Sequence, residues 1–414
     1  MKKSAPIIFC LSILSLAVLL GCEIILPCDS QIQLPANIDE IVNPTPEQRD
    51  FYQNNLCHNI LVAVVDTGVD YNHPVLQDNI HFCLDRNHKP TRFGWDFIGR
   101  DRWPCPYIGR RTSISCFEME LIDNLIKEDK KLASYLEKKR NIVQEYLFSV
   151  WHGTTLAGIT VGENKNIGIL SYRVVPPNTN RDLWCDYAMK SVENIIHACR
   201  RAADDGADIV LITSFIHFEK KDNPCRFEKM IALKKEFEAL IRGHPDILYI
   251  VGAGNCCGYT YDGSNFKIID FPSGIIAENF LVVGSVSQDG QVSRFSNIPA
   301  GRINSVFLKG RVEACIYPRN MLRVPNEYFR SMPPLLDNLR EGNETYKSIA
   351  SYLGMFMEKS KMTKYGTSVS AAIAAHRCAE LWSTHKKWTP GEVIDGLKKC
   401  CEKTAIGIYS EVFK

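Results

Sequence analysis

Neither sign of charge dominates this 414-residue sequence, which holds 49 lysine and arginine residues against 47 aspartate and glutamate residues. Without a basic excess, or a long run of either sign, nucleic acid and acidic polymers are not expected as partners. Internal repeats and low-complexity tracts are absent as well. Because 45% of the residues are hydrophobic, we expect a globular chain with one large core or two modest ones.

The N-terminal apolar run is too short to cross a membrane comfortably. It covers residues 7–20 and follows Lys2 and Lys3. A basic start before a short apolar run predicts a signal peptide over residues 1–21, and therefore an exported protein.

The end of this signal peptide, Leu-Leu-Gly21-Cys22, resembles the lipobox of bacterial lipoproteins. The resemblance implies cleavage before Cys22, a diacylglycerol group on its sulfur, and acyl chains that hold the protein on a membrane. Glu23 provides no inner-membrane retention signal of the Asp type, so the outer membrane is expected if the cell has one. The alternative is an ordinary signal peptide with an incidental cysteine. Residues 22–57 are expected to form a tether and N-terminal extension.

The cysteines lack the spacing of metal ligands. Two of the sixteen, Cys10 and Cys22, belong to the signal peptide and the anchor, and the remaining fourteen include no CxxC pair. We therefore predict no metal site. An even number of cysteines in an exported chain predicts some disulfides, and buried, reduced cysteines are the alternative.

Short β-branched runs alternate with helical stretches from about residue 58 onward. This alternation is typical of strands and crossover helices around a mostly parallel sheet. Four strands are predicted, over residues 60–65, 208–212, 247–251 and 280–284. One helix is predicted over residues 190–204. The expected fold class is α/β, with a doubly wound, mostly parallel sheet flanked by helices.

Two segments interrupt this alternation. The first segment, at about residues 100–148, includes a charged stretch with apolar residues at helical spacing, which predicts a helical insertion. Residues 310–362 are rich in Pro, Asn, Arg and Tyr with little periodicity, which predicts a long surface insertion. Residues 390–404 fit one amphipathic helix. We therefore expect one domain over residues 58–388, followed by a C-terminal helix and tail over 389–414.

Asp66 follows the first predicted strand and opens an Asp-Thr-Gly tripeptide. Ligands and catalytic groups gather at the carboxyl ends of strands in open α/β sheets, so this position favours a functional role. A turn at the end of the strand is one alternative. The Asp-Thr-Gly of aspartic proteases is another, but it requires two such aspartates on an all-β fold, and this chain has one in an α/β pattern.

Two further tripeptides stand at predicted helix starts. His152 opens His-Gly-Thr, and Ser368 ends Gly-Thr-Ser at the beginning of an alanine-rich helix. The free N–H groups and the dipole of a helix N-terminus suit a nucleophile beside a developing oxyanion, although an N-cap serine is the alternative. A lone histidine would be unremarkable. Three such tripeptides, each at the end of an element, together indicate one catalytic site.

The order Asp-Thr-Gly, His-Gly-Thr, Gly-Thr-Ser resembles the subtilisin-like serine peptidase family, the subtilases. The similarity also includes residues 72–76, 205–210, 252–255, 278–286 and 291–297. It implies a subtilisin-like fold and a serine endopeptidase that acts on peptides or proteins without a cofactor. Calcium sites are common in the family, but no acidic loop here is specific enough to assign one.

The resemblance also implies a role for each matched residue. Ser368 would attack the scissile carbonyl, His152 would accept its proton, and Asp66 would orient the imidazole. Asn255, in an Ala-Gly-Asn context, would donate its side-chain amide to the oxyanion. The alternative for Asn255 is a turn residue.

The strand that pairs with substrate in the family departs from the usual pattern. The family reads toward Asn-Met-Ser-Leu-Gly, whereas this chain has Leu-Ile-Thr213-Ser214-Phe215. Thr213, Ser214 and Phe215 are therefore the candidate substrate-binding residues. Phe215 in place of glycine is expected to narrow or reshape the pocket for the residue before the scissile bond.

Three functions remain open at this point. The first is a hydrolytic endopeptidase. The second is a catalytically silent, surface-anchored binding protein on the same fold, which the altered substrate strand favours and the retained catalytic side chains oppose. The third is a peptide acyl-transferase that uses the same triad and passes the acyl group to an amine.

Overall fold

The computed structural model describes residues 58–104, 152–175, 184–260, 268–312, 364–403 and 409–410, apart from a few positions within these ranges. The signal peptide, Cys22, the tether and almost all of both predicted insertions lie outside the described residues. Within the described ranges, no helix is both long enough and apolar enough to cross a membrane.

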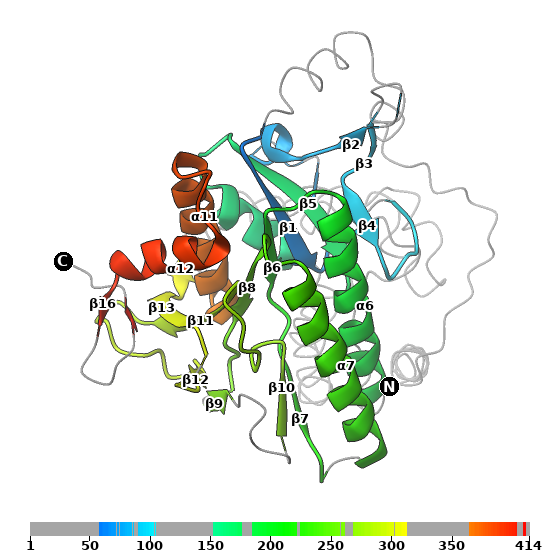
Figure 1. Ribbon diagram of the computed structural model, residues 1–414, viewed down its shortest axis with the longest axis vertical. Helices are drawn as coiled ribbons and strands as arrows, with labels where there is room; N and C mark the ends of the chain where they lie inside the picture. Colours follow the sequence, from blue (N-terminus) through cyan, green and yellow to red (C-terminus); the bar gives the residue numbers. More distant parts are fainter. Residues whose placement is uncertain are drawn as a thin grey trace, which may run out of the picture.

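A nine-stranded sheet forms the centre of the molecule (Figure 1). Its strands are β1 (Ile60–Asp66), β4 (Gly94–Asp96), β5 (Ile167–Arg173), β6 (Ile209–Ile212), β8 (Leu248–Gly252), β11 (Phe280–Val286), β13 (Ser305–Lys309), β16 (Glu402–Lys403) and β17 (Tyr409–Ser410). Their order is β16-β17-β13-β11-β8-β6-β1-β5-β4, and every neighbouring pair is parallel except β16 and β17. From β1 the chain adds β5 and β4 on one side and then β6, β8, β11 and β13 on the other. This reversal makes the sheet doubly wound and confirms the predicted α/β fold.

The first strand shows how the sequence produces a sheet that is buried on both faces. Val62 and Val64 pack in one apolar layer, and Ala63 and Val65 pack in the other, because successive residues of a strand point to opposite faces. All four side chains are fully buried. Parallel strands between two helical layers therefore read as continuous apolar runs instead of alternating ones.

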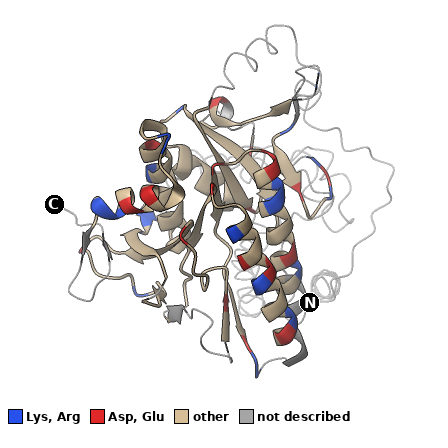
Figure 2. Ribbon diagram, viewed as in Figure 1, with Lys and Arg blue, Asp and Glu red and all other residues tan. Residues whose placement is uncertain are grey.

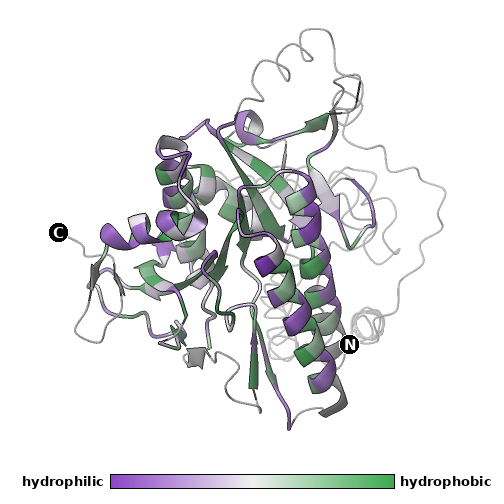
Figure 3. Ribbon diagram, viewed as in Figure 1, coloured by the Kyte–Doolittle hydropathy of each residue, from purple (hydrophilic) through white to green (hydrophobic). Residues whose placement is uncertain are grey.

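Helices cover both faces of the sheet (Figure 1). The apolar layer on one face is completed by α6 (Trp184–Asp204) and α7 (Pro224–Gly243). The layer on the other face is completed by α11 (Thr367–Thr384), α12 (Pro390–Lys399) and a helix over residues 152–161. Charged residues of both signs lie along α6 and α7 (Figure 2), whereas most strands between the layers are hydrophobic (Figure 3).

The smaller elements frame the central sheet. They are a 3-10 helix η1 (Gln77–Asn79) and the two-stranded pairs β2 (Cys83–Leu84) with β3 (Pro90–Arg92), β7 (Ile216–Glu219) with β10 (Ile268–Phe271), β9 (Tyr259–Thr260) with β12 (Ile298–Pro299), and β14 (Arg311–Val312) with β15 (Lys364–Tyr365). The β14–β15 pair brackets the second predicted insertion. It brings both ends of that insertion next to the start of α11.

The C-terminal segment contains more regular structure than a helix and a tail. Thr389 and Glu392 form a capping box that starts α12 at Pro390, because each side chain accepts a hydrogen bond from the backbone of the other residue. After α12 the chain continues into β16 and β17, and Phe307 of β13 pairs with Ser410. The segment thus extends the central sheet.

The expected disulfides are not found among the described side chains. Cys199, Cys378 and Cys400 are free thiols, and the first two are completely buried. Burial raises the pKa of the Cys199 and Cys378 thiols well above the ordinary value, so both remain protonated and act as small apolar side chains. For the cysteines outside the described residues, disulfides stay a prediction.

Candidate active site

The carboxylate of Asp66 lies at the carboxyl end of β1, where the winding of the sheet reverses. Ligand sites of open α/β sheets lie at such switch points. The residue is 1% exposed, and the Thr67 N–H donates a 2.6 Å hydrogen bond to Asp66 Oδ1. This contact fixes the carboxylate and leaves Oδ2 for other donors.

His152 begins the 152–161 helix and lies directly beside this carboxylate. Its Nδ1 is 2.8 Å from Asp66 Oδ2. The Gly153 N–H donates to Thr67 Oγ1 over 3.0 Å, which ties the start of the helix to the residue after Asp66. A Cβ at Gly153 would lie 2.4 Å from the Gly68 carbonyl oxygen, so this close approach requires glycine. The Asp-Thr-Gly and His-Gly-Thr tripeptides therefore dock onto each other.

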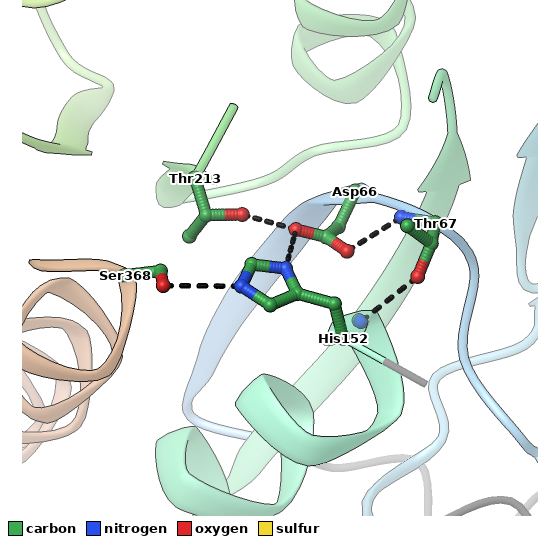
Figure 4. A network of polar contacts seen from close by, with 6 residues as sticks. Asp66, Thr67, His152, Thr213 and Ser368 are labelled. Carbon is green, nitrogen blue, oxygen red and sulfur yellow. Dashed lines mark hydrogen bonds and ion pairs between the residues drawn. The ribbon is translucent and has the colours of Figure 1, made fainter. Parts of the chain in front are cut away.

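Ser368 completes a series of three hydrogen-bonded side chains (Figure 4). Its Oγ lies 3.0 Å from His152 Nε2, and the residue, second in α11, is 8% exposed. A carboxylate can only accept, so the contact with Asp66 places the imidazole proton on Nδ1. Nε2 is then left to accept a proton from the Ser368 hydroxyl.

The surroundings of Asp66 keep it ionised. Burial alone would raise its pKa, but the positive charge that His152 can carry and hydrogen bonds from His152, Thr213 and Thr67 outweigh burial, so the pKa of Asp66 is lowered. A carboxyl whose pKa is lowered by folding stabilises the folded state above its unfolded pKa, and this contribution is lost as the pH falls through the lowered value. At neutral pH Asp66 is thus a fixed negative charge behind His152.

Asn255 lies in the loop after β8 and contacts the first residue of α11. Its Oδ1 accepts hydrogen bonds from the Thr367 N–H (3.0 Å) and the Thr367 hydroxyl (3.1 Å). Because a backbone N–H can only donate, Oδ1 must face Thr367, and the amide nitrogen faces away from it. A Cβ at Gly366 would lie 3.3 Å from Ser368 Oγ and 3.6 Å from Asn255 Nδ2. Both atoms therefore border the same small space.

The three candidate substrate-binding residues have different surroundings. The Thr213 hydroxyl donates to Asp66 Oδ2, so this side chain supports the Asp66 carboxylate, which the sequence did not indicate. The ring of Phe215 lies against Gly254, since a Cβ on that glycine would be 2.8 Å from the ring. Ser214 is partly buried.

Sequence reasoning overlooked the two threonines inside the tripeptides. Thr67 joins Asp66 to Gly153, and Thr367 holds the amide of Asn255. The available signal was their place in the tripeptides, each beside a glycine and a catalytic candidate. Both residues connect one motif to another.

Metal-ligating side chains do not gather at any one place in the described part of the chain. No group of three or more His, Cys, Asp or Glu residues there has the arrangement to hold an ion. Cys22 and the predicted lipid anchor lie outside the described residues.

A carboxylate, an imidazole and a serine hydroxyl hydrogen-bonded in series are the arrangement found in serine hydrolases, and here they lie on a doubly wound parallel sheet. Fold and site together define this class. The chain belongs to the subtilase family, whose model matches residues 58–408. Subtilases are serine proteases, so the identification from the motifs is confirmed at the level of the family.

Solved structures include chains similar to this one. A lanthipeptide protease shares 17% identity, with 87% of this chain and 86% of its own covered, at a TM-score of 0.51. A cold-adapted subtilisin-like serine proteinase shares 14% identity over 85% of this chain and 88% of its own (TM-score 0.48). The nisin leader peptidase NisP from Lactococcus lactis shares 16% identity over 85% of both chains (TM-score 0.46). A comparison with curated proteins gives no match.

Proposed function

We propose that this chain is an active serine endopeptidase that hydrolyses peptide or protein substrates, with Asp66, His152 and Ser368 as its catalytic triad. The observation that carries the proposal is the unbroken series of hydrogen bonds through the three side chains, 2.8 Å and 3.0 Å long. Each residue comes from a different element, and each is held by contacts of its own.

In the proposed mechanism, Ser368 Oγ attacks the scissile carbonyl carbon while its proton passes to His152 Nε2. The ionised Asp66 stabilises the imidazolium that forms. His152 then gives this proton to the leaving amine, which departs and leaves an acyl group on Ser368. A water molecule then enters, and its oxygen bonds to the acyl carbon while one of its protons passes to His152. The bond between this carbon and Ser368 Oγ breaks, His152 returns the proton to Ser368 Oγ, and the acyl group leaves as a carboxylic acid.

Asn255 supplies the oxyanion donor in this proposal. Its Nδ2 faces the space beside Ser368 Oγ, and the backbone N–H of Ser368 at the start of α11 provides a second donor. A donor of this kind acts on charge that is present in the transition state and absent from the substrate. In subtilisin, a member of this family, loss of the corresponding asparagine costs about 10²- to 10³-fold in kcat.

A specific observation favours the second candidate, a catalytically silent binding protein. The Phe215 ring lies against Gly254, the residue before Asn255. At position 215 the family usually has a glycine, so this ring is an addition to the site. A ring so close to the oxyanion donor restricts the substrates that fit. A silent protein would retain the hydrogen-bond series without turnover.

A fluorophosphonate probe tests the proposal, because it reacts only with an activated serine. The purified full-length chain, held in detergent, is expected to be labelled on Ser368 when native and to lose labelling after denaturation. Ser368→Ala should abolish the label. Ser370→Ala, a buried serine two residues further along α11, should retain it.

Failure of the native chain to label would contradict the endopeptidase proposal and support the silent protein. Where labelling succeeds, digestion of a peptide library followed by product sequencing separates the two remaining reactions. Hydrolysis gives new carboxyl termini, whereas acyl transfer joins two peptides.

The position of Phe215 predicts a preference for a small side chain before the scissile bond. Phe215→Gly is expected to raise kcat/KM about tenfold or more for peptides with Phe or Leu at this position, and to change it little for Ala. Phe218→Leu, which alters a buried residue of the same region, is the control. If the unmodified enzyme cleaved Phe and Ala peptides equally well, the preference would be refuted.

We also propose that Cys22 carries a lipid anchor that holds the exported protein on a membrane. Cells supplied with an alkyne fatty acid are expected to incorporate it into the unmodified chain and into Cys10→Ser, but not into Cys22→Ser. Cys10 lies within the apolar run of the signal peptide and serves as the matched control. Labelling of Cys22→Ser at the unmodified level would contradict the proposal.

A further inference from the structure

One buried side chain holds the loop that carries Asn255, which comprises residues 253–258. Asn297 is 2% exposed and lies between β11 and β12, directly before the first residue of β12. Its hydrogen bonds reach both sides of Asn255: Oδ1 accepts from the N–H groups of Cys256 (3.0 Å) and Gly258 (3.1 Å), Nδ2 donates to the Ala253 carbonyl (3.1 Å), and its own N–H donates to the Gly254 carbonyl (2.9 Å). A single residue therefore satisfies two donors and two acceptors of this loop.

The backbone at Gly254 is shaped to receive this side chain. Gly254 has a φ of +102°, and a Cβ there would lie 2.6 Å from Asn297 Nδ2. Only glycine tolerates both this backbone conformation and this approach. The neighbouring Ile298 N–H donates to the Gly258 carbonyl over 2.8 Å, so the contact continues into the β9–β12 pair.

Asn297 is itself anchored to the central sheet. The hydroxyl of Ser296 accepts a hydrogen bond from the Ser285 N–H of β11 (2.9 Å) and donates to the Asn297 carbonyl (2.9 Å). Ser285 Oγ is also hydrogen-bonded to Ser293 Oγ over 2.7 Å. The position of the side chain is thus set by a rigid strand and by a buried hydrogen-bond network.

Asn255, by contrast, is exposed, and among the described residues its side chain is hydrogen-bonded only to Thr367. Burial therefore does not hold it in place. Its amide can face the oxyanion only if the backbone on either side keeps its position. That backbone is the part of the loop that Asn297 holds.

We propose that Asn297 is a positioning residue that sets the location of the oxyanion donor Asn255. The inference rests on the proposed function, because it acts on kcat through Asn255. A shift of about 1 Å in a catalytic group can cost on the order of 10²-fold in rate. Loss of the contacts from Asn297 therefore lowers kcat while substrate binding is retained.

A double-mutant cycle in the full-length chain tests this role. Asn297→Asp keeps the acceptor oxygen for the two N–H groups but replaces the donor to Ala253 with a second acceptor. We expect kcat to fall about ten- to a hundredfold with KM changed by about twofold or less. In an Asn255→Ala background, the same substitution is expected to change kcat by about twofold or less, because the group that it positions is gone.

Active-site titration with the fluorophosphonate normalises these rates to the folded, reactive fraction. Asn279→Asp is the matched control, since Asn279 is also buried and its amide donates to three backbone carbonyls away from the site. It should lower the melting temperature but retain kcat in the folded fraction. An equal loss of kcat in both backgrounds would mean that Asn297 is merely structural, and would overturn the inference.

Hydrogen exchange separates failure of this inference from failure of the proposed function. Asn297→Ala is expected to speed the exchange of the Cys256 and Gly258 amides at least about tenfold, whether or not the chain turns over substrate. Unchanged exchange would overturn the positioning role. If Asn255→Ala left kcat unaltered, the proposed oxyanion role would be wrong, and the positioning role would fall with it.

Discussion

Replacement of His152 with alanine is expected to lower kcat about a million-fold, because in the proposed mechanism the imidazole both accepts the Ser368 proton and delivers it to the leaving amine. No other described group takes its place. Asp66 Oδ2 contacts the serine only through the histidine, over 2.8 Å and 3.0 Å. Without the imidazole, the serine hydroxyl keeps its proton and its ordinary weak nucleophilicity.

Single-turnover kinetics with a peptide ester should measure the residual rate of the variant. An ester is chosen because its leaving group needs less protonation than the amine of an amide, so a slow variant still gives a measurable rate. His197→Ala is the control, because His197 stacks on Phe97 at the surface, outside the site. The double variant His152→Ala/Ser368→Ala should be no slower than either single variant, because the residues act as one unit. Additive losses would contradict the proposed triad.

The strands of the sheet could be predicted where a buried strand consists almost entirely of apolar residues. β1 up to Val65, β8, and β11 up to Gly284 are runs without a charged or hydroxyl side chain other than Tyr249, and the sequence predicts each of these strands to within two residues of its bounds. β5 was not predicted, because Ser171 and Arg173 interrupt its apolar pattern. Both side chains are buried through distant partners: Ser171 donates to the Pro104 carbonyl (3.0 Å), and Arg173 pairs with Asp96 (2.9 Å).

The site could also be predicted where local sequence is sufficient, and not where distant segments must pair. The sequence singles out Asp66, His152, Ser368 and Asn255 because each stands in a short motif. It does not reveal what Thr213 does, since that depends on the register of the sheet. Val65 of β1 pairs with Ile212 of β6, so the next residues of both strands, Asp66 and Thr213, meet side by side. Contacts of this kind depend on the pairing of segments far apart in the chain.

The second large effect is expected from Asp66→Asn, which keeps the shape of the site and removes its charge. The Thr67 N–H faces Oδ1 and can only donate, so the new amide must keep its oxygen there. Its NH₂ group then takes the place of Oδ2 and donates to His152 Nδ1 and to the Thr213 hydroxyl.

This exchange reverses the tautomer of the imidazole. His152 must accept at Nδ1, so its proton moves to Nε2, where it faces Ser368 and prevents the nitrogen from acting as a base. We expect kcat to fall about 10⁴-fold with KM little changed. Nitrogen NMR of the labelled histidine should show the proton on Nε2 in Asp66→Asn and on Nδ1 in the unmodified chain. Asp270→Asn is the control, because Asp270 is equally buried and lies 2.8 Å from Nδ1 of another histidine. It should leave kcat within about threefold, since the proposed general base does not depend on the pair of Asp270 and this histidine.

An Asp66→Asn variant that retained the Nδ1 proton and the rate of the unmodified chain would show that the carboxylate does not orient His152.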